Sequence, residues 1–355
     1  MTGAPAGGPP ADALGHVLRA LASGAAIAPE AVTAAFDRVM RGEATAAQIA
    51  ALLMGLRVRG ESAETIAAVA RALRSAMVPL RAERPDEVVD TCGTGGGAVA
   101  TFNISTAAAL VAAGAGARVA KHGNRSFTSR SGSADVLEAL GVPVDRPAAV
   151  AERALAEAGI AFMFAPLMHP AMRHVGPVRR ELAVPTVMNV VGPLANPARA
   201  GRQVLGVAES HRVALLAGAL AALGSTHALV VHGAPGMDEI SPLGPTRVVE
   251  VRGDGREGAV VGEWTIEPAL YGFAAVDAAE LAGGSPAENA AVIEAVLDGG
   301  GAPGARAAVV LNAAAALYVA GVAHGYADGV ERARTALDDG SAGRALERLR
   351  AAYRG

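Results

Sequence analysis

The stretch DTCGTGGGAVATFNIST, residues 90–106, decides how the chain is expected to fold. It follows two valines, residues 88–89, that are typical of a short buried strand, and it leads into an alanine-rich helical pattern beginning at Ser105. A second strand is expected at residues 117–120, so the stretch is the first turn of a βαβ unit. Because ligands bind beyond the carboxyl ends of parallel strands, this glycine loop is a candidate site.

The composition of the loop favours an anion. Gly93, Gly95, Gly96 and Gly97 let the backbone approach a ligand closely and direct successive N–H groups toward it, and the following helix adds a favourable dipole. Glycine runs also occur in plain tight turns, so the loop alone leaves both interpretations open. No lysine follows the glycines as in a Walker loop, and the spacing differs from a dinucleotide-binding fingerprint.

The overall composition limits the function classes. Of the 355 residues, 52% are apolar and only 3% aromatic, which suits close-packed helices and covered parallel strands and disfavours a base-stacking surface. The net charge is −3 without long runs of one sign, so nucleic acid is not expected as a partner. Cys92 is the only cysteine, which excludes an internal disulfide or a cysteine-based zinc site and fits a reducing compartment.

The chain shows no sign of export or membrane insertion. Residues 1–15 lack the basic start and apolar run of a secretory signal, and we expect them to form a frayed tail. The most apolar segment, residues 307–323, falls just short of a membrane span and contains Asn312, so it is predicted to be a buried helix. We therefore expect a cytoplasmic protein without membrane contact.

Two domains are predicted. Residues 1–85 have the apolar periodicity of packed helices, with helix starts at Thr45, in a capping box with Gln48, and at Ser62. In residues 86–355 strands alternate with helices, which predicts an α/β domain with a mostly parallel central sheet covered on both faces. A segment rich in Pro, His, Arg and Asn predicts short helical pieces that return to the helical domain near residues 168–195.

The remaining elements follow from the same patterns. Strands are expected at residues 160–164, 204–208 and 228–231 and near Val248 and Val260, and helices at 105–114, 133–140, 147–158 and 211–223, before a helical C-terminal third.

A second group of polar residues follows the strand at residues 117–120. Cations and hydroxyl groups occur together there, as a diphosphate or a phosphorylated sugar requires, whereas a solvated basic turn would not need the hydroxyls. These donors are Lys121, His122, Asn124, Arg125, Ser126, Thr128, Ser129, Arg130, Ser131 and Ser133.

Other candidates each have two interpretations. Asn103, Ser105 and Thr106 occupy positions where helix caps are common, but their polar groups face the same space as the glycine loop. Asp238 and Glu239 are either solvated loop acids or ligands that would bind Mg²⁺ against a polyphosphate. Arg179 could pack its aliphatic stem on the surface or bind a substrate carboxylate through two hydrogen bonds.

Together these motifs resemble the anthranilate phosphoribosyltransferases in order and spacing, over effectively the whole chain. KHGNR and the PVRREL segment are the most specific, whereas the glycine loop is also similar to that of the pyrimidine nucleoside phosphorylases. The matching motifs are GTGG at Gly93, NIST at Asn103, KHGNR at Lys121, SGSADVLEALG at Ser131, HPAMRHVGPVRREL at His169, GPLANP at Gly192, QVLGV at Gln203 and HGAPGMDEIS at His232.

The resemblance implies a homodimer of the nucleoside phosphorylase/phosphoribosyltransferase-like fold, with a small N-terminal helical domain, a larger α/β domain and an active site at their hinge. It implies transfer of the phosphoribosyl group of 5-phosphoribosyl 1-diphosphate (PRPP) to the amine of anthranilate, with Mg²⁺, in tryptophan synthesis.

The resemblance also implies roles for individual residues. PRPP would be bound by Gly93, Thr94, Gly96, Gly97, Thr101, Asn103, Ser105, Thr106, Lys121, Arg125 and Ser133. Anthranilate would meet Gly93, His122, Asn124 and Arg179, the metal would meet Ser105, Asp238 and Glu239, and the catalytic residues would be Lys121, Asn124 and Arg179.

One position departs from the family, which commonly has Asp directly after GTGG where this chain has Gly97. The missing carboxylate removes a negative charge near the diphosphate, so we expect the magnesium dependence to differ from that of relatives. Two alternatives remain: a pyrimidine nucleoside phosphorylase-like enzyme of the same fold, and a catalytically silent nucleic-acid-binding relative. The balanced charge and the complete set of donors disfavour the second.

Overall fold

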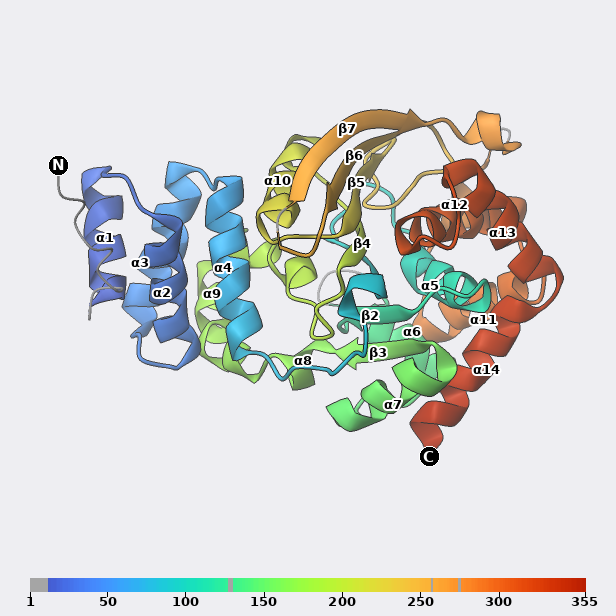
Figure 1. Ribbon diagram of the computed structural model, residues 1–355, viewed down its shortest axis with the longest axis horizontal. Helices are drawn as coiled ribbons and strands as arrows, with labels where there is room; N and C mark the ends of the chain where they lie inside the picture. The colour runs from blue at the N-terminus through green and yellow to red at the C-terminus, as the bar shows by residue number, and fades with distance from the viewer. Residues whose placement is uncertain (1–11, 127–129, 257, 274–275) are drawn as a thin grey trace. The chain divides into compact units, whose positions relative to one another are not determined.

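The structure, a computed structural model, describes residues 12–126, 130–256, 258–273 and 276–355 (Figure 1). Within these residues the chain divides into two compact units. The helical unit contains residues 12–77 and His169–Ala195, and the α/β unit contains Val78–Met168 and Asn196–Gly355. Most of the predicted N-terminal tail, together with Thr128 and Ser129, lies outside the described residues.

In the helical unit the predicted helix starts are confirmed. The Thr45 hydroxyl accepts a hydrogen bond from the Gln48 N–H, and the Gln48 side chain accepts one from the Thr45 N–H, while Ser62 caps the next helix by accepting from the Thr65 N–H. The apolar stripe of α3 from Ile49 to Leu56 is buried, and burial of each such side chain contributes about 1.5–3 kcal/mol relative to exposure. The helices of this unit are α1 (Ala13–Ser23), α2 (Pro29–Met40), α3 (Ala46–Arg59), α4 (Ala63–Ala76) and α9 (Gly176–Leu182).

The proline-rich segment forms short pieces, as its composition predicts. Before α9 the chain makes one 3-10 turn at Pro170–His174, and after it come Val187–Asn189 and Gly192–Leu194. The Arg74 side chain of α4 donates to the Leu194 carbonyl oxygen at 2.7 Å, which ties the end of this segment to the helical unit. Prolines near the start of these pieces interrupt longer helices because they lack an N–H donor.

The α/β unit begins at Val78, earlier than the predicted boundary after residue 85. The Val78 N–H donates to the Met168 carbonyl at 2.8 Å, and the Leu80 N–H donates to the Pro197 carbonyl at 3.0 Å. These backbone hydrogen bonds join the segment to the α/β unit.

One mostly parallel sheet lies at the centre of the α/β unit, which confirms the predicted fold class. Within the described residues the strand order is β3-β2-β1-β4-β5-β6-β7, with β3 to β5 parallel along this order and with β6 and β7 antiparallel. The strands are β1 (Val89–Gly93), β2 (Val119–Gly123), β3 (Ile160–Phe164), β4 (Arg202–Gly206), β5 (His227–Gly233), β6 (Thr246–Gly253) and β7 (Gly258–Ile266).

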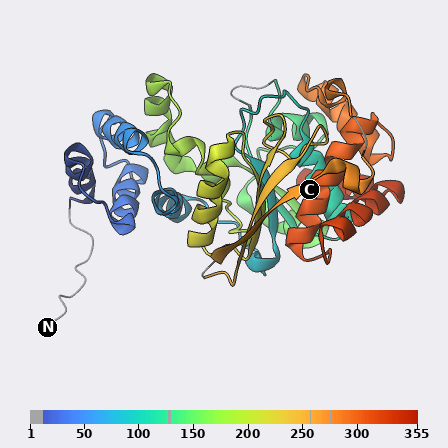
Figure 2. The same cartoon turned by 90° about the horizontal axis from the view of Figure 1, so that it is seen from above.

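Helices cover the two faces of the parallel strands. In Figure 2 α10 (Val213–Ala222) lies on one side of the sheet and α12 (Pro303–Ala320) on the other, where α5 (Ile104–Gly114) also packs. The expectation of cover on both faces is wrong for β7, because this edge strand of an antiparallel pair exposes Val260 and Val261. The other helices of the unit are α6 (Ser133–Ala139), α7 (Ala148–Ala158), α8 (Ala165–Met168), α11 (Pro286–Leu297), α13 (Tyr326–Asp338) and α14 (Ser341–Arg354).

Two helices complete the core. In the described residues, α12 is the one helix long and apolar enough to span a membrane by length and composition, but 78% of it is buried inside the protein, in line with the predicted buried helix. The last helix, α14, is fastened to β3 by Tyr353, whose hydroxyl donates to the Phe162 carbonyl oxygen and accepts from the Phe162 N–H at 2.9 Å.

The strands around the glycine loop extend further than predicted. Strand β1 continues to Gly93 and β2 to Gly123, so Lys121 and His122 lie inside the sheet and not after it. In both strands the apolar residues end before the strand does. The polar residues that follow stay in the sheet because they have buried hydrogen-bond partners.

Candidate active site

The strand order reverses its direction beside β1, which is where open α/β sheets bind ligands. From β1 the chain crosses to β2 on one side, and from β4 it crosses to β5 on the other. The expected ligand site therefore lies beyond the carboxyl ends of β1 and β4, which end in register at Gly93 and Gly206.

The loop that carries Asp238 and Glu239 packs directly onto these two strand ends. A Cβ atom at Gly93 would lie 2.4 Å from the Asp238 Oδ2 atom, and one at Gly206 would lie 1.7 Å from the Asp238 carbonyl oxygen. The Gly206 distance is to a backbone atom and is too short for any side chain, whereas a side chain at Gly93 would have to displace the Asp238 carboxylate. The two glycines are thus what allows the acidic loop to reach the end of the sheet.

The glycine loop closes around the same carboxylate. The Gly95 N–H donates to Asp238 Oδ2 at 2.7 Å, and Gly95 and Gly96 have φ angles of 74° and 80°, in the left-handed region that favours glycine. Thr94 fixes the loop to β4, because its N–H donates to the Gly206 carbonyl at 2.9 Å and its hydroxyl accepts from the Ala208 N–H at 3.1 Å. A Cβ at Gly97 would lie 3.0 Å from Asp238 Oδ1, so a carboxylate at this position would face Asp238.

Lys121, Ser105 and Glu239 meet beside this loop. The Lys121 ammonium donates to the Thr91 carbonyl oxygen and, at 3.1 Å, to the Ser105 hydroxyl. Glu239 lies beside them: it lines the same small cavity as Ser105 and Thr91, and the polar groups of Ser105 favour the charged form of its carboxyl. Three segments that are far apart in the sequence, residues 105, 121 and 239, therefore converge at one point in the α/β unit.

Desolvation disfavours the charged forms of Lys121, Asp238 and Glu239. Burial, with repulsion from Asp238, raises the pKa of Glu239 to about 8, although Lys121 and Ser105 act in the opposite direction. Burial also raises the pKa of Asp238 and lowers that of Lys121, whose charge is favoured by Asp90, Cys92 and Glu239. Asp238 and Glu239 are two half-buried carboxylates whose charged forms are disfavoured, and a bound cation would stabilise those charged forms.

The donor set fits Mg²⁺ only together with a substrate. Among the described residues, His, Cys, Asp and Glu do not form a group of three or more that could bind a metal. Asp238, Glu239 and the Ser105 hydroxyl provide oxygen ligands, and Mg²⁺ is commonly bound by one or two carboxylates with water and substrate phosphate. The remaining ligands would therefore come from a phosphate group.

A buried asparagine supports the acidic loop from below. The Asn312 side-chain oxygen accepts from the Ile240 N–H at 2.9 Å, and its amide donates to the Ile240 carbonyl oxygen at 2.8 Å. A cavity of about 10 Å³, enough for roughly one water, lies between Asn312, Glu239 and Cys92. In the sequence, Asn312 stands out only as a polar residue in an apolar helix. A lone amide in such a helix is the signal that could have indicated its hydrogen bonds to the acidic loop.

At the start of α5 the side chains do not act as ordinary caps. Asn103 is the N-cap residue but makes no capping hydrogen bond with its side chain. Its amide donates to the Ser131 carbonyl at 3.2 Å, and its Oδ1 accepts from the Ser131 hydroxyl and from the Asn289 amide. Thr101 pairs through its backbone with Ala282. The buried Thr106 hydroxyl has no hydrogen-bond partner in the residues that the structure describes.

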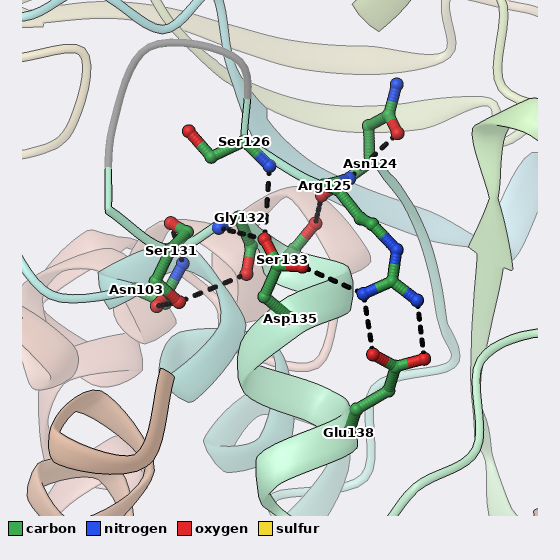
Figure 3. Close-up of polar contacts among 9 residues, drawn as sticks. All are labelled: Asn103, Asn124, Arg125, Ser126, Ser131, Gly132, Ser133, Asp135 and Glu138. Atoms are coloured by element: carbon green, nitrogen blue, oxygen red, sulfur yellow. Dashed lines mark hydrogen bonds and ion pairs between the residues drawn. The ribbon is translucent and has the colours of Figure 1, made fainter. Parts of the chain in front are cut away.

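The donors after β2 lie where the chain bends back into α6, as Figure 3 shows. The Ser133 hydroxyl donates to the Asn124 carbonyl oxygen at 3.3 Å, and the Asn124 side-chain oxygen accepts from the Arg125 N–H at 2.8 Å. The Arg125 guanidinium is bound by two acids, Asp135 and Glu138, which sequence analysis did not single out.

The opposite face of the sheet carries a buried carboxylate that sequence analysis missed. Asp90 accepts hydrogen bonds from the His122 N–H at 3.2 Å and from the Asn196 amide at 2.7 Å. Burial raises its pKa to about 6, against the effect of Lys121. In the sequence, the signal for this buried carboxylate is a charged residue between Val89 and Gly93, inside a strand.

Arg179 is the one proposed site residue that lies in the helical unit, and its surroundings are described within that unit only. It lies on α9 and is half-buried. Burial lowers its pKa, and no acidic side chain or other hydrogen-bond acceptor pairs with its guanidinium in the described parts of the chain. A half-buried cation of this kind can bind an anionic ligand.

Comparison with known proteins identifies the family. Residues 85–343 match the glycosyl transferase family a/b domain, and residues 16–77 match the helical bundle domain of the same family. The anthranilate phosphoribosyltransferase of Thermomicrobium roseum is 52% identical over 95% of this chain and 96% of its own length.

Solved structures agree with this assignment. The anthranilate phosphoribosyltransferase of Thermus thermophilus has a TM-score of 0.89 and 43% identity, covering 96% of this chain and 99% of its own. The enzyme of Saccharomyces cerevisiae in complex with PRPP and Mg has a TM-score of 0.86 and 26% identity, covering 98% and 99%. The resemblance found in the sequence is therefore confirmed, and the chain belongs to the anthranilate phosphoribosyltransferase family.

Proposed function

We propose that the chain transfers the phosphoribosyl group of PRPP to the amine of anthranilate, giving N-(5-phosphoribosyl)anthranilate and diphosphate. The observation that carries this proposal is the convergence of Lys121, Ser105 and Glu239 beside the glycine loop, at the carboxyl ends of β1 and β4. Backbone N–H groups, a buried cation and two carboxylates at one strand end are the groups that a sugar diphosphate with a divalent ion requires.

In the reaction the bond between C1 of the ribose and the diphosphate oxygen breaks, and its electron pair leaves with the diphosphate. The amine nitrogen of anthranilate forms the new bond to C1 and then loses a proton to solvent. Because an aromatic amine is neutral near pH 7, it needs positioning more than a general base. Stabilising the negative charge on the departing diphosphate is the difficult step, and electrostatic catalysis acts on that step.

Lys121 and the amides of Gly96 and Gly97 supply this stabilisation in our proposal, because the Thr94 and Gly95 N–H groups already donate to Gly206 and Asp238. The Lys121 ammonium is held by the Thr91 carbonyl and the Ser105 hydroxyl, so it is preorganised and does not have to move toward the substrate. Mg²⁺ bound by Asp238, Glu239 and Ser105 would supply further positive charge to the diphosphate oxygens. Removing one preorganised donor of this kind typically costs about 2.7–4 kcal/mol of transition-state stabilisation.

The remaining contacts to PRPP are assigned by position. The phosphate and ribose groups are bound by the glycine loop, the start of α5 and the donors after β2. These residues are Gly93, Thr94, Gly96, Gly97, Thr101, Asn103, Ser105, Thr106, Lys121 and Ser133. The buried Thr106 hydroxyl supports this assignment, since a buried hydroxyl without a protein partner has an unused donor and acceptor.

Anthranilate is assigned to Arg179, with Asn124, His122 and Gly93. Arg179 would bind the carboxylate through two parallel hydrogen bonds, and the absence of an acidic partner for it among the described residues supports this assignment. We expect Arg179→Ala to raise the Michaelis constant for anthranilate while leaving that for PRPP near wild type. Unchanged constants for anthranilate would exclude the assignment.

We also propose a homodimer located in the cytoplasm and acting in tryptophan synthesis. The single cysteine fits a reducing compartment. Light scattering of the purified protein measures the oligomeric state.

The decisive experiment follows anthranilate consumption by fluorescence with PRPP and Mg²⁺, omitting each component in turn. The proposal predicts turnover that requires both. Release of uracil from uridine and phosphate, without anthranilate consumption, would instead support the nucleoside phosphorylase alternative and refute our assignment.

A further inference from the structure

Two short segments of the chain meet just beyond β2, where Ser133, assigned to PRPP, and Asn124, assigned to anthranilate, lie. Residues 124–126 form one side and residues 132–135 the other, and we call this junction the neck (Figure 3). Asp135, in the first turn of α6, joins the two sides with one carboxylate oxygen. Its Oδ2 atom accepts from the Ser126 N–H at 3.1 Å and from the Gly132 N–H at 2.8 Å.

The two sides of the neck also pack backbone against backbone. A Cβ at Gly132 would lie 2.4 Å from the Ser126 nitrogen and 2.5 Å from the Asn124 carbonyl oxygen, so only glycine allows this approach. The Asn124 carbonyl accepts hydrogen bonds from the Ala134 N–H at 3.2 Å and from the Ser133 hydroxyl at 3.3 Å. The positions of Asn124 and Ser133 are therefore coupled to one another.

Arg125 completes the neck from the outside. Its Nη1 atom donates to Asp135 Oδ1 at 2.9 Å and to Glu138 Oε2 at 2.6 Å, and its Nη2 donates to Glu138 Oε1 at 2.7 Å. The guanidinium also lies over the Phe164 ring, 5.5 Å from the ring centroid. Asp135 thus binds the backbone with one oxygen and Arg125 with the other.

The charges of this cluster argue against a direct role in binding diphosphate. One guanidinium is paired with two carboxylates, so the formal charge of the cluster is −1. Hydrogen bonds to Glu138 and Asp135 raise the pKa of Arg125, while the amides of Gly132 and Ser126 and the Arg125 cation lower that of Asp135 despite its partial burial. A cluster of this formal charge would repel a polyanion unless Arg125 left both acids.

We propose that Arg125, Asp135 and Glu138 are positioning residues that fix the neck. Through the neck they hold Ser133 in the arrangement that binds the phosphorylated sugar, together with Asn124, which is assigned to anthranilate. This inference rests on the proposed function. It reassigns Arg125, which the family resemblance places on PRPP, to a role that acts through Asp135 and without contact to the substrate.

The test compares Asp135→Asn and Glu138→Gln with Glu294→Gln. The control removes the charge of a matched acid, because Glu294 forms a similar ion pair with Arg350 at 2.6 Å on other helices of the same unit. Asparagine keeps an acceptor for the Ser126 and Gly132 amides, and Glu138→Gln leaves the neck backbone untouched. Thermal unfolding of each variant shows whether it folds.

Two measurements report on the neck. Hydrogen–deuterium exchange of peptides covering residues 119–126 and 130–139, without substrate, should be faster in both variants than in the wild type and the control. Steady-state kinetics should show a Michaelis constant for PRPP raised about tenfold in Asp135→Asn and about threefold in Glu138→Gln, with turnover numbers within about twofold. A purely structural role would lower stability without raising the constant for PRPP.

A double-mutant cycle separates positioning from ligand binding. If Arg125 acts through the acids, Arg125→Gln combined with Glu138→Gln should raise the constant for PRPP no more than Arg125→Gln alone. The proposal is overturned if Glu138→Gln has wild-type exchange and kinetics while Arg125→Gln loses PRPP affinity, because Arg125 would then be a ligand. Absence of PRPP turnover in the wild type would refute the proposed function. Normal turnover in the wild type, with exchange and Michaelis constants unchanged in both acid variants, would refute only the positioning role of the neck.

Discussion

Replacing Gly206 by alanine should displace the loop that carries Asp238 and Glu239. The added Cβ would lie 1.7 Å from the Asp238 carbonyl oxygen and 2.4 Å from the carbonyl carbon, and these are backbone atoms that cannot rotate away. To restore a separation of at least about 3.0 Å, the loop must recede by about 1.3 Å. Such overpacking typically costs about 1–3 kcal/mol of folding free energy.

The loss of activity should exceed the loss of stability. A misplacement of about 1 Å can cost on the order of a hundredfold in rate, and here the displaced loop carries both carboxylates assigned to Mg²⁺. We therefore expect Gly206→Ala to lower kcat/KM for PRPP about a hundredfold and to raise the Mg²⁺ concentration needed for half activity. Urea unfolding and the anthranilate fluorescence assay, each with a Mg²⁺ titration, measure the two effects.

Gly262→Ala is the matched control. Gly262 also lies in a strand of the same sheet, but nothing is within 4 Å of the position of its Cβ, and its φ angle is not in the left-handed region. Alanine there should be neutral or should stabilise by about 0.4–1 kcal/mol, through the unfolded chain. If Gly206→Ala matched Gly262→Ala in stability, turnover and Mg²⁺ requirement, the argument that these glycines admit the acidic loop would be wrong.

Three further predictions concern the same unit. Gly97→Asp should shift the Mg²⁺ optimum, because its Cβ would lie 3.0 Å from Asp238 Oδ1 and a third carboxylate would join the pair; an unchanged titration would count against this. Asn312→Leu should lower the free energy of unfolding by about 2–5 kcal/mol, since the buried N–H and carbonyl of Ile240 would both lose their partner, and a stability equal to wild type in urea unfolding would contradict it. Burial, helped by the Arg252 cation, lowers the pKa of His227 from 6.5 to about 4. As the pH decreases from 6.5 through 4, the unfolded chain is protonated before the folded one, so the free energy of unfolding should fall by up to about 3 kcal/mol. The His227→Gln variant should lose less stability between pH 7 and 4.5.

Much of the architecture could be predicted from local patterns. The caps at Thr45 and Ser62 and the alternation of strands and helices depend on neighbouring residues, so they are visible in one sequence. The ends of β1 and β2 were placed too early because Asp90 and Lys121 are polar and yet buried. Their partners, Asn196 and Ser105, are far away or on another element, and sequence spacing does not show such partners.

The site divides in the same way. Motifs identified the glycine loop, Lys121 and the acidic pair, because each type of residue indicates its chemistry. They did not show that Asn103 binds Asn289 in place of capping α5, nor that two acids bind Arg125. Roles of this kind depend on long-range contacts, which only the folded chain defines.

The attachment of α14 by Tyr353 bears on how the protein should be handled. This phenol is fully buried, and its hydroxyl is hydrogen-bonded to both the N–H and the carbonyl oxygen of Phe162. Proteolysis that removes this tyrosine would leave the Phe162 N–H and carbonyl without their partner at one edge of the sheet, whereas cleavage after Tyr353 would keep both hydrogen bonds. A preparation in which some chains have lost Tyr353 would thus contain molecules that differ in stability, and intact-mass spectrometry would detect the shortened chains.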